Sequence, residues 1–181
     1  MLQDKDALEK WYLKNDPWGY ENSPDDLRRR GELLGLISGL RPRRTLDIGC
    51  GDGFVTFALP GAQVIGVDIS ENAIGLAQSI QQNRPDSARF LFIPRSIFDL
   101  SELFPAHSFD LIVITGVLYD QYIGNAKSVV RTLIDRLLVP SGILVCCHIE
   151  DWYRPFFCYT TIDQARYPYR NYTHLLEVNK K

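Results

Sequence analysis

The amino-acid sequence predicts an α/β protein in which helices cover both faces of a doubly wound, mostly parallel sheet. Five short apolar runs, typical of strands buried on both faces, alternate along the chain with segments of helical periodicity. A further run, Thr173–Val178, follows without another helical pattern and predicts an antiparallel C-terminal strand. The 181 residues suffice for one domain, which we divide into an N-terminal segment (1–40) and a core (41–181).

The first helix has a clear start in the sequence. Ser23 suits the N-cap, Pro24 the first helical position, and acidic residues follow in the first turn; the helix is expected to end near Gly39. Strands and helices then alternate, and the last parallel strand follows a turn at 140–142. The expected strands are 44–48, 64–68, 88–93, 109–115 and 143–149. The expected helices between them are 54–59, 71–83 and about 125–138.

Composition and charge narrow the class of protein. Hydrophobic residues make up 45% and charged residues 23% of the chain, as in ordinary globular domains. The first six residues lack a basic region followed by an apolar run, and no run of about 18 apolar residues occurs, so we expect no export, no membrane span and a cytoplasmic location. A net charge of −2 argues against nucleic acid as the substrate, despite the cluster Arg41, Arg43 and Arg44.

The cysteines give no sign of a metal site. Cys50, Cys146, Cys147 and Cys158 lack the spacing of metal ligands, and the adjacent pair would point to opposite faces of one strand. We therefore expect reduced, apolar side chains and no bound metal.

A glycine-rich loop follows the first predicted strand. The stretch Thr45–Phe54 reads TLDIGCGDGF, with glycine at 49, 51 and 53. Glycine permits positive φ angles and lets a ligand lie directly on the backbone. Asp68 ends the next strand, where a carboxylate can accept hydrogen bonds from two ribose hydroxyls. The spacing therefore predicts a nucleoside ligand.

Two acidic residues distinguish this loop from a dinucleotide site. The usual dinucleotide pattern is Gly-x-Gly-x-x-Gly, whereas this run is Gly-x-Gly-x-Gly with Asp47 before it and Asp52 inside it. These acids would repel a pyrophosphate and suit a sulfonium and an ammonium. The loop resembles motif I of the class I S-adenosylmethionine-dependent methyltransferases, and Val64–Ser70 resembles their ribose-binding motif. The resemblance runs from Leu33 onward and implies a Rossmann-like sheet with S-adenosylmethionine as the cofactor.

The resemblance also implies which residues hold the cofactor. The glycine loop would hold the methionine portion, Asp68 the ribose and Ile69 the adenine face. The family usually has an aspartate where this sequence has Ser96, so that a hydroxyl or the Ile97 amide would replace it; Asp99 is either another contact or a helix-capping acid. The expected cofactor-binding residues are Arg29, Asp47, Gly49, Cys50, Gly51, Gly53, Asp68, Ile69, Ser96, Ile97 and Thr115.

The methionine carboxylate requires a cation, and three arginines lie on the first predicted helix. Arg28, Arg29 and Arg30 are adjacent, and neighbouring helix positions differ by about 100°, so one of them can point inward. We expect it to be Arg29, because Asp16–Tyr20, Ser23 and the arginines together resemble the opening of the nodulation-type N-methyltransferases. Those enzymes act on the amine of a chitooligosaccharide.

Three side chains are candidates for the methyl-transfer step. Methyl transfer is an in-line displacement that benefits from aligned reactants and excluded water. Tyr119 and Tyr122 follow the fourth strand, where each can line the methyl channel, stabilise a cation or simply pack. His148 ends the fifth strand and can take a proton from the acceptor, or can be a structural histidine bonded to Glu150 or Asp151.

These features predict a methyltransferase that acts on nitrogen or oxygen of a small polar acceptor, with sugar-like acceptors included. A non-catalytic nucleoside-binding protein of the same fold and a nicotinamide-binding oxidoreductase fragment remain alternatives. The Asn-Pro-Pro-aromatic motif of base-directed methyltransferases does not occur, which argues further against DNA. Trp11, Tyr12, Trp18 and Tyr20 precede the core, and we expect a lid over the cofactor or a strut packed on the core.

Overall fold

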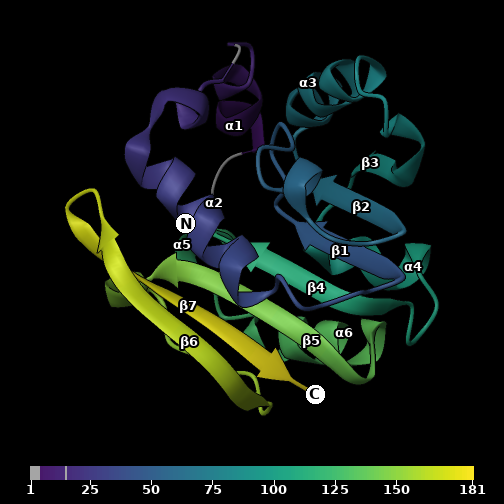
Figure 1. Cartoon of the computed structure of the whole chain (residues 1–181), viewed down its shortest axis with the longest axis vertical. Helices are drawn as coiled ribbons and strands as arrows, with labels where there is room; N and C mark the ends of the chain where they lie inside the picture. The colour runs from purple at the N-terminus through teal and green to yellow at the C-terminus, as the bar shows by residue number, and fades with distance from the viewer. Residues whose placement is uncertain (1–4, 15) are drawn as a thin grey trace.

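A computed structural model describes residues 5–14 and 16–181, and seven strands in this part of the chain form one sheet (Figure 1). The strand order is β3–β2–β1–β4–β5–β7–β6. The first five strands pair in parallel, and β7 pairs antiparallel with β5 and β6. The strands are β1 (Arg44–Ile48), β2 (Gln63–Asp68), β3 (Phe90–Pro94), β4 (Phe109–Thr115), β5 (Leu138–Ile149), β6 (Thr160–Tyr169) and β7 (Tyr172–Lys180). The predicted fold class is confirmed.

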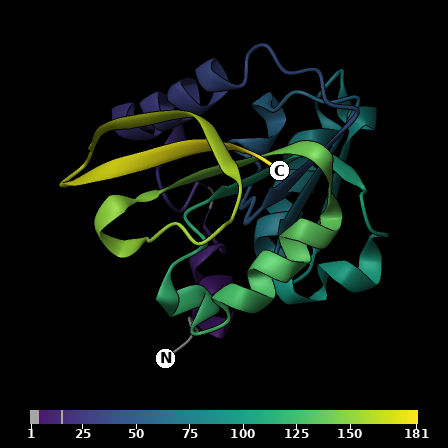
Figure 2. The ribbon, with the colours of Figure 1, turned by 90° about the horizontal axis from the view of Figure 1, so that it is seen from below.

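Helices cover both faces of this sheet, with α2 and α6 on opposite sides (Figure 2). The α-helices are α1 (Lys5–Trp11), α2 (Pro24–Leu36), α3 (Glu71–Gln82), α4 (Leu100–Leu103), α5 (Asp120–Ile123) and α6 (Lys127–Leu137). Short 3-10 helices are η1 (Tyr20–Asn22), η2 (Thr56–Ala58), η3 (Ser87–Arg89), η4 (Ile97–Asp99) and η5 (Glu150–Trp152). In residues 5–14 and 16–181, no helix is both long and apolar enough to cross a membrane. Residues 1–4, part of the stretch used above to argue against export, lie outside the described residues.

The continuous apolar runs arise because each central strand faces two hydrophobic cores. In β4, Leu111 packs in one core with Leu33 of α2, while its neighbour Ile112 packs in the other with Ile134 of α6. Successive strand residues point to opposite faces, so a strand covered on both sides needs apolar residues at consecutive positions.

Helices α2 and α3 each begin after a serine whose side chain caps the first turn. Ser23 Oγ accepts a hydrogen bond from the Asp26 N–H at 3.2 Å, with Pro24 at the first helical position. Ser70 Oγ accepts one from the Ala73 N–H at 3.1 Å. Both predicted helix starts are confirmed, and each cap satisfies a donor that the first turn would otherwise leave without a partner.

Three sequence-based expectations about elements are wrong. The expected turn at 140–142 lies inside β5, which begins at Leu138 and pairs with β4 through a shift in register between Phe109 and Leu111. The segment 54–59 forms only the short η2, because Pro60 forces the preceding Leu59 into extended backbone (φ −67°, ψ 144°) and ends the turn. Strand β6 was not foreseen. It is an edge strand whose residues are mostly exposed, so it needs no continuous apolar run and can contain Pro168.

Candidate active site

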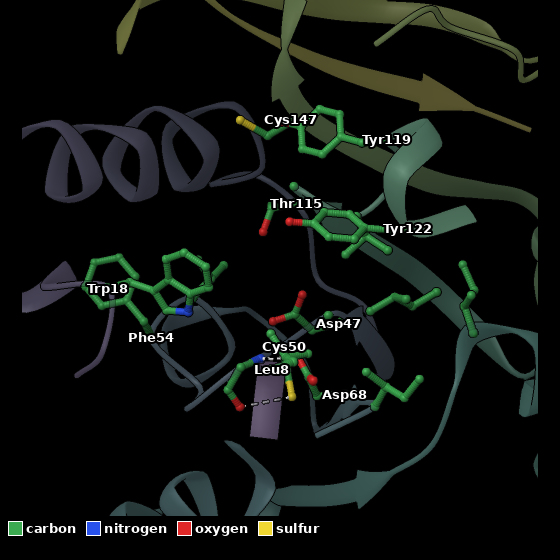
Figure 3. Close-up of a pocket in the computed structure, with 18 of the residues that line it drawn as sticks. Leu8, Trp18, Asp47, Cys50, Phe54, Asp68, Thr115, Tyr119, Tyr122 and Cys147 are labelled. Carbon is green, nitrogen blue, oxygen red and sulfur yellow. Dashed lines mark hydrogen bonds between the residues drawn. The ribbon is translucent and has the colours of Figure 1, made fainter. Parts of the chain in front are cut away.

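A cavity of about 640 Å³ opens at the carboxyl ends of the parallel strands (Figure 3). This volume lies within the range of roughly 300–1,000 Å³ typical of small-molecule sites. All the expected cofactor-binding residues except Gly53 line it, together with side chains from α1 and the β6–β7 turn. Ten of the eleven expected residues therefore lie around one cavity.

The glycine loop is held in a conformation that only glycine adopts easily. Gly49 and Gly51 have φ angles of 76° and 55°. A Cβ atom on Gly49 would overlap Val117, and one on Gly51 would lie 2.8 Å from the Tyr12 hydroxyl. Gly53 departs from the expectation: it does not line the cavity, and its missing side chain makes room for the Phe57 ring, 2.6 Å from the Cβ position.

Asp68 ties the glycine loop to the end of β2. Its Oδ2 accepts a hydrogen bond from the Gly51 N–H at 2.9 Å, and its Oδ1 accepts one from the Ser70 N–H at 3.0 Å. Burial raises the pKa of this carboxyl, while the backbone hydrogen bonds act in the opposite direction. A carboxylate oxygen can accept more than one hydrogen bond, so both oxygens retain capacity for ribose hydroxyls.

Asp47 is buried in the cavity wall with half of its carboxylate unsatisfied. Its Oδ2 accepts a hydrogen bond from the Thr56 hydroxyl at 2.6 Å. Its Oδ1 has no hydrogen-bond partner in the described part of the chain. Burial raises the pKa of Asp47 to about 6. A buried carboxylate oxygen without a partner is costly, so this position calls for a donor, ideally a cationic one, from a ligand.

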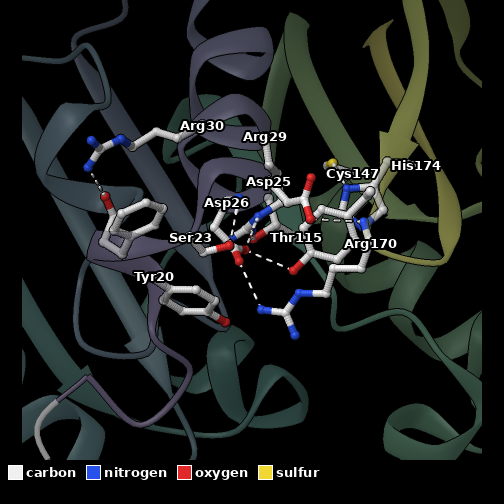
Figure 4. Close-up of polar contacts among 12 residues, drawn as sticks. Tyr20, Ser23, Asp25, Asp26, Arg29, Arg30, Thr115, Cys147, Arg170 and His174 are labelled. Carbon is white, nitrogen blue, oxygen red and sulfur yellow. Dashed lines mark hydrogen bonds and ion pairs between the residues drawn. The ribbon is translucent and has the colours of Figure 1, made fainter.

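Arg29 is the arginine of the three that points into the cavity (Figure 4). Its Nε donates to Asp26 Oδ1 at 3.2 Å, and its Nη1 lies 3.4 Å from the Thr115 hydroxyl. Arg28 is exposed and pairs with Glu32, and Arg30 donates to a loop carbonyl at 3.2 Å while stacking on the Phe54 ring. The orientation of the three side chains agrees with the expectation from helix geometry.

Asp26 joins this arginine to the β6–β7 hairpin, which sequence reasoning did not anticipate. The fully buried carboxylate accepts hydrogen bonds from Arg29, from the Tyr169 hydroxyl at 2.8 Å and from Arg170 at 3.0 Å (Figure 4). Burial alone would raise the pKa of Asp26, but these partners and Ser23 hold it below its usual value. Its place in the first turn of α2 gave no signal beyond that of an ordinary helix-start acid.

The expected adenine end lies beside β3. Ile69 and Ser96 line the cavity, Ile69 with 41% of its surface exposed, and Ile97 is buried in its wall. Ser96 Oγ caps η4 by accepting from the Phe98 N–H at 3.3 Å. Asp99 fits neither of its expected roles, because it does not line the cavity and its side chain makes no capping hydrogen bond.

The methyltransferase-domain family matches residues 42–172 of this sequence. The chain belongs to this family. Membership confirms the resemblance to class I S-adenosylmethionine-dependent methyltransferases, and with it S-adenosylmethionine as the cofactor.

Curated relatives of this methyltransferase domain are longer proteins. The ubiquinone biosynthesis O-methyltransferase of Paracidovorax citrulli is 34% identical over 133 residues, which cover 69% of this chain and 53% of the relative. The tRNA U34 carboxymethyltransferase of Vibrio cholerae is 34% identical over 116 residues, covering 62% of this chain and 32% of that protein. The chain thus spans about half, or less, of the length of these relatives.

Solved structures share the fold of the methyltransferase domain over nearly its whole length. The N-methyltransferase NodS of Bradyrhizobium japonicum, in complex with S-adenosyl-L-homocysteine, has a TM-score of 0.77 and 24% identity, covering 98% of this chain and 97% of NodS. The 1,6-didemethyltoxoflavin-N1-methyltransferase of Burkholderia thailandensis has a TM-score of 0.72 and 22% identity, covering 97% of this chain and 85% of that enzyme.

Two of the three candidate catalytic side chains line the cavity of the methyltransferase domain. Tyr119 and Tyr122 face it with ring centroids 5.9 Å apart. The Tyr119 hydroxyl accepts a hydrogen bond from the Ile149 N–H at 2.8 Å, which fixes the ring. Burial raises the pKa of Tyr119 to about 12, so it stays neutral at physiological pH.

The structure contradicts the expectation that His148 takes a proton from the acceptor. His148 is fully buried, does not line the cavity and stacks on Tyr153 with centroids 4.4 Å apart. Its Nε2 accepts a hydrogen bond from the Leu118 N–H at 3.1 Å, so its partner is a backbone amide and not a neighbouring carboxylate. Burial lowers the pKa of His148 to about 3. Because strand residues alternate, Cys147 faces the cavity and His148 faces away from it.

A different histidine of this domain reaches the cavity. His174 of β7 pairs with the end of β5, lines the cavity and stacks on Tyr169 with centroids 3.8 Å apart. Its Nδ1 lies 3.4 Å from the Tyr167 hydroxyl and 3.7 Å from Cys147 Sγ. Burial, together with the charge of Arg29, lowers the pKa of His174 to about 4, so the ring is neutral. The sequence alone gave no signal for this placement, because it depends on the strand pairing.

Proposed function

We propose that this chain binds S-adenosylmethionine and transfers its methyl group to nitrogen or oxygen of a small polar acceptor. The observation that carries the proposal is the pair Asp47 and Arg29 in one cavity wall. Asp47 offers a buried carboxylate oxygen that has no hydrogen-bond partner among the described residues, and Arg29 offers a guanidinium. Both residues line the same cavity. This pair is complementary to the ammonium and carboxylate of an α-amino acid.

The remaining residues support a nucleoside beside that amino acid. Asp68 would accept hydrogen bonds from the ribose hydroxyls, and half-exposed Ile69 would pack on the adenine ring. The φ angles of Gly49 and Gly51 keep the backbone free of side chains where the ligand would lie against it. When bound, S-adenosylmethionine supplies a methyl group attached to positively charged sulfur.

The chain would contribute mainly position and exclusion of water to the transfer. Tyr119 is fixed by its hydrogen bond to β5, and the side chains of Tyr12 and Trp18 close the cavity from the N-terminal segment. Aligned reactants in a dry site account for much of the acceleration of a displacement reaction. Among small polar acceptors, a sugar-like one is suggested by the resemblance of Asp16–Tyr20 to the nodulation-type enzymes, and it serves as a comparison compound below.

Calorimetric titration of the purified protein tests the proposal. We expect S-adenosylhomocysteine to bind with one site per chain and NAD to show no binding, because the acidic glycine loop repels a pyrophosphate. Binding of NAD without S-adenosylhomocysteine would contradict the proposal. Formation of S-adenosylhomocysteine from S-adenosylmethionine with any member of a panel of amines and phenols would then exclude the non-catalytic alternative.

A further inference from the structure

The cavity has two chemically different ends. At the cofactor end, described above, Gly49, Asp68 and Ile69 follow β1 and β2. Figure 3 shows Tyr119 and Cys147 at the opposite end from Asp68, with Asp47 and Thr115 between them. We call this opposite end the acceptor end. The residues that define it are Tyr119, Tyr122, Trp152, Tyr169, Arg170 and Tyr172.

Aromatic rings form a connected wall at the acceptor end. Tyr119 lies next to Tyr122, its centroid is 5.8 Å from that of Trp152, and Trp152 is 4.8 Å from Tyr172. Tyr119 is buried, whereas Trp152 and Tyr172 remain 48% and 39% exposed. A flat ligand that covers large exposed rings at the mouth of a cavity removes their apolar surface from contact with water. This wall therefore favours a planar ring.

The charges at the acceptor end are positive. Among the described residues, the acids that line the cavity are Asp47 and Asp68, and the structure places Asp68 far from this wall and Asp47 at its border. Arg170 brings a guanidinium whose side chain is 46% exposed and which uses one nitrogen to contact Asp26. The same Asp26 carboxylate also serves Arg29, so a single buried carboxylate faces two guanidiniums.

We propose that the acceptor end binds a planar aromatic molecule that carries an anionic substituent, an inference that rests on the proposed function. The ring lies against Trp152 and Tyr172, and the anion accepts hydrogen bonds from the free N–H groups of Arg170. A cationic amine would meet the guanidiniums of Arg29 and Arg170, whose shared acid, Asp26, is fully buried and already paired with both. A sugar can stack its C–H face on these rings, but a neutral sugar carries no anion to accept hydrogen bonds from Arg170. The aromatic hydroxyl or ring nitrogen to be methylated would then point toward the border between the two ends.

Binding of probe compounds to the protein saturated with S-adenosylhomocysteine tests this inference. The aromatic acids 4-hydroxybenzoate, salicylate and nicotinate are titrated calorimetrically beside their uncharged amides, benzylamine and glucosamine. We expect at least one acid to bind about tenfold or more tightly than its amide, and no binding of benzylamine or glucosamine. If none of the acids binds, or if the amine or the sugar binds more tightly, the inference is overturned.

Variants locate the binding at the named residues. Arg170→Gln should remove the difference between acid and amide, and Trp152→Ala should weaken both roughly tenfold. Arg166→Gln is the matched control, because Arg166 lies on the same hairpin, pairs with Glu150 at 2.8 Å and does not line the cavity. Equal selectivity in Arg170→Gln and Arg166→Gln would refute the role of Arg170.

Binding of S-adenosylhomocysteine separates failure of this inference from failure of the proposed function. It is measured first on every variant, together with thermal unfolding. If the unmodified protein does not bind it, the proposed function fails; if it binds but no aromatic acid follows, only the inference fails. Should Arg170→Gln not fold, Arg170→Lys keeps the positive charge without the planar fork and is expected to retain part of the preference for the acid.

Discussion

Replacing Asp47 with asparagine should stabilise the ligand-free protein and weaken ligand binding at the same time. Burial raises the pKa of this carboxyl from its usual 3.8 to about 6, so at neutral pH the folded protein holds an ionised group in an unfavourable site. The difference, at about 1.36 kcal/mol per pH unit, corresponds to about 3 kcal/mol. The asparagine N–H groups would lack a partner and cost about 1 kcal/mol, which leaves a net stabilisation of about 2 kcal/mol.

The effect has a defined pH dependence. Because the folded-state pKa of Asp47 lies above the unfolded value, the folded state binds the extra proton and the stabilising contribution is complete below about pH 4. It is lost as the pH rises through about 6. Asparagine does not titrate, so the advantage of Asp47→Asn should grow between pH 4 and 7 and remain constant above that range.

Thermal unfolding at several pH values and calorimetry with S-adenosylhomocysteine measure the two effects. At pH 8 a gain of about 2 kcal/mol corresponds to a melting temperature roughly 4–8 °C higher for a chain of this size. Loss of one charge-assisted hydrogen bond should weaken S-adenosylhomocysteine binding roughly 10- to 150-fold. Asp163→Asn, at an exposed position of β6, is the control. If Asp47→Asn is less stable at pH 8 and binds the ligand as tightly as the unmodified protein, the argument from the unpaired oxygen is refuted.

Two further substitutions address the nucleoside end. Asp68→Ala should abolish detectable binding of S-adenosylhomocysteine in calorimetry, because the carboxylate that would hold the ribose also holds the Gly51 and Ser70 amides; unchanged affinity would remove Asp68 from the site. Gly51→Val should lower the free energy of unfolding by about 1–2 kcal/mol through strain at a φ of 55°, and it should prevent ligand binding by displacing Tyr12. A variant that melts normally and still binds would show that this glycine only makes a turn.

The parallel half of the fold could be predicted because local sequence determines it. The bounds of β1 and β4 were predicted residue by residue, since both strands are buried on two faces and end at polar or glycine residues. The edge strand β6 lacks such a pattern because solvent covers much of it, and its place is set by pairing with β7. A hydrophobic sequence pattern indicates which residues of an element are buried, so it cannot identify a strand that is mostly exposed.

The candidate site divides along the same line. Asp47, Gly49 and Asp68 could be predicted because they follow consecutive strands whose carboxyl ends must meet at one edge of the sheet. His148 and His174 could not be assigned correctly. Which face of β5 meets the cavity depends on the cores packed against it, and His174 reaches the cavity only through its pairing with Ile149. The local sequence does not identify a site residue that reaches the cavity through the pairing of distant strands.

The way in which α1 is attached favours the lid over the strut for the N-terminal segment. None of the residues of α1 is buried, and its main link to α3 is polar: the Glu9 carboxylate accepts hydrogen bonds from the Ser70 hydroxyl and the Glu71 and Asn72 amides at 2.8, 2.7 and 3.0 Å. Water can replace such contacts, so α1 can leave without exposing a core, whereas α2 cannot.

We therefore expect that deletion of residues 1–20 leaves a protein that still melts cooperatively, because neither packed apolar cluster contains a described residue before Leu33 of α2, and the buried Tyr12 lies outside both. S-adenosylhomocysteine should bind more weakly to the truncated protein, because the deletion removes the wall formed by Tyr12 and Trp18. Glu9→Ala in the full chain should produce a milder form of the same effect, a faster release of ligand in stopped-flow measurements, with Lys10→Ala as the control. If the truncated protein does not fold, the segment is a strut, and the release rate in Glu9→Ala should then equal that of the control.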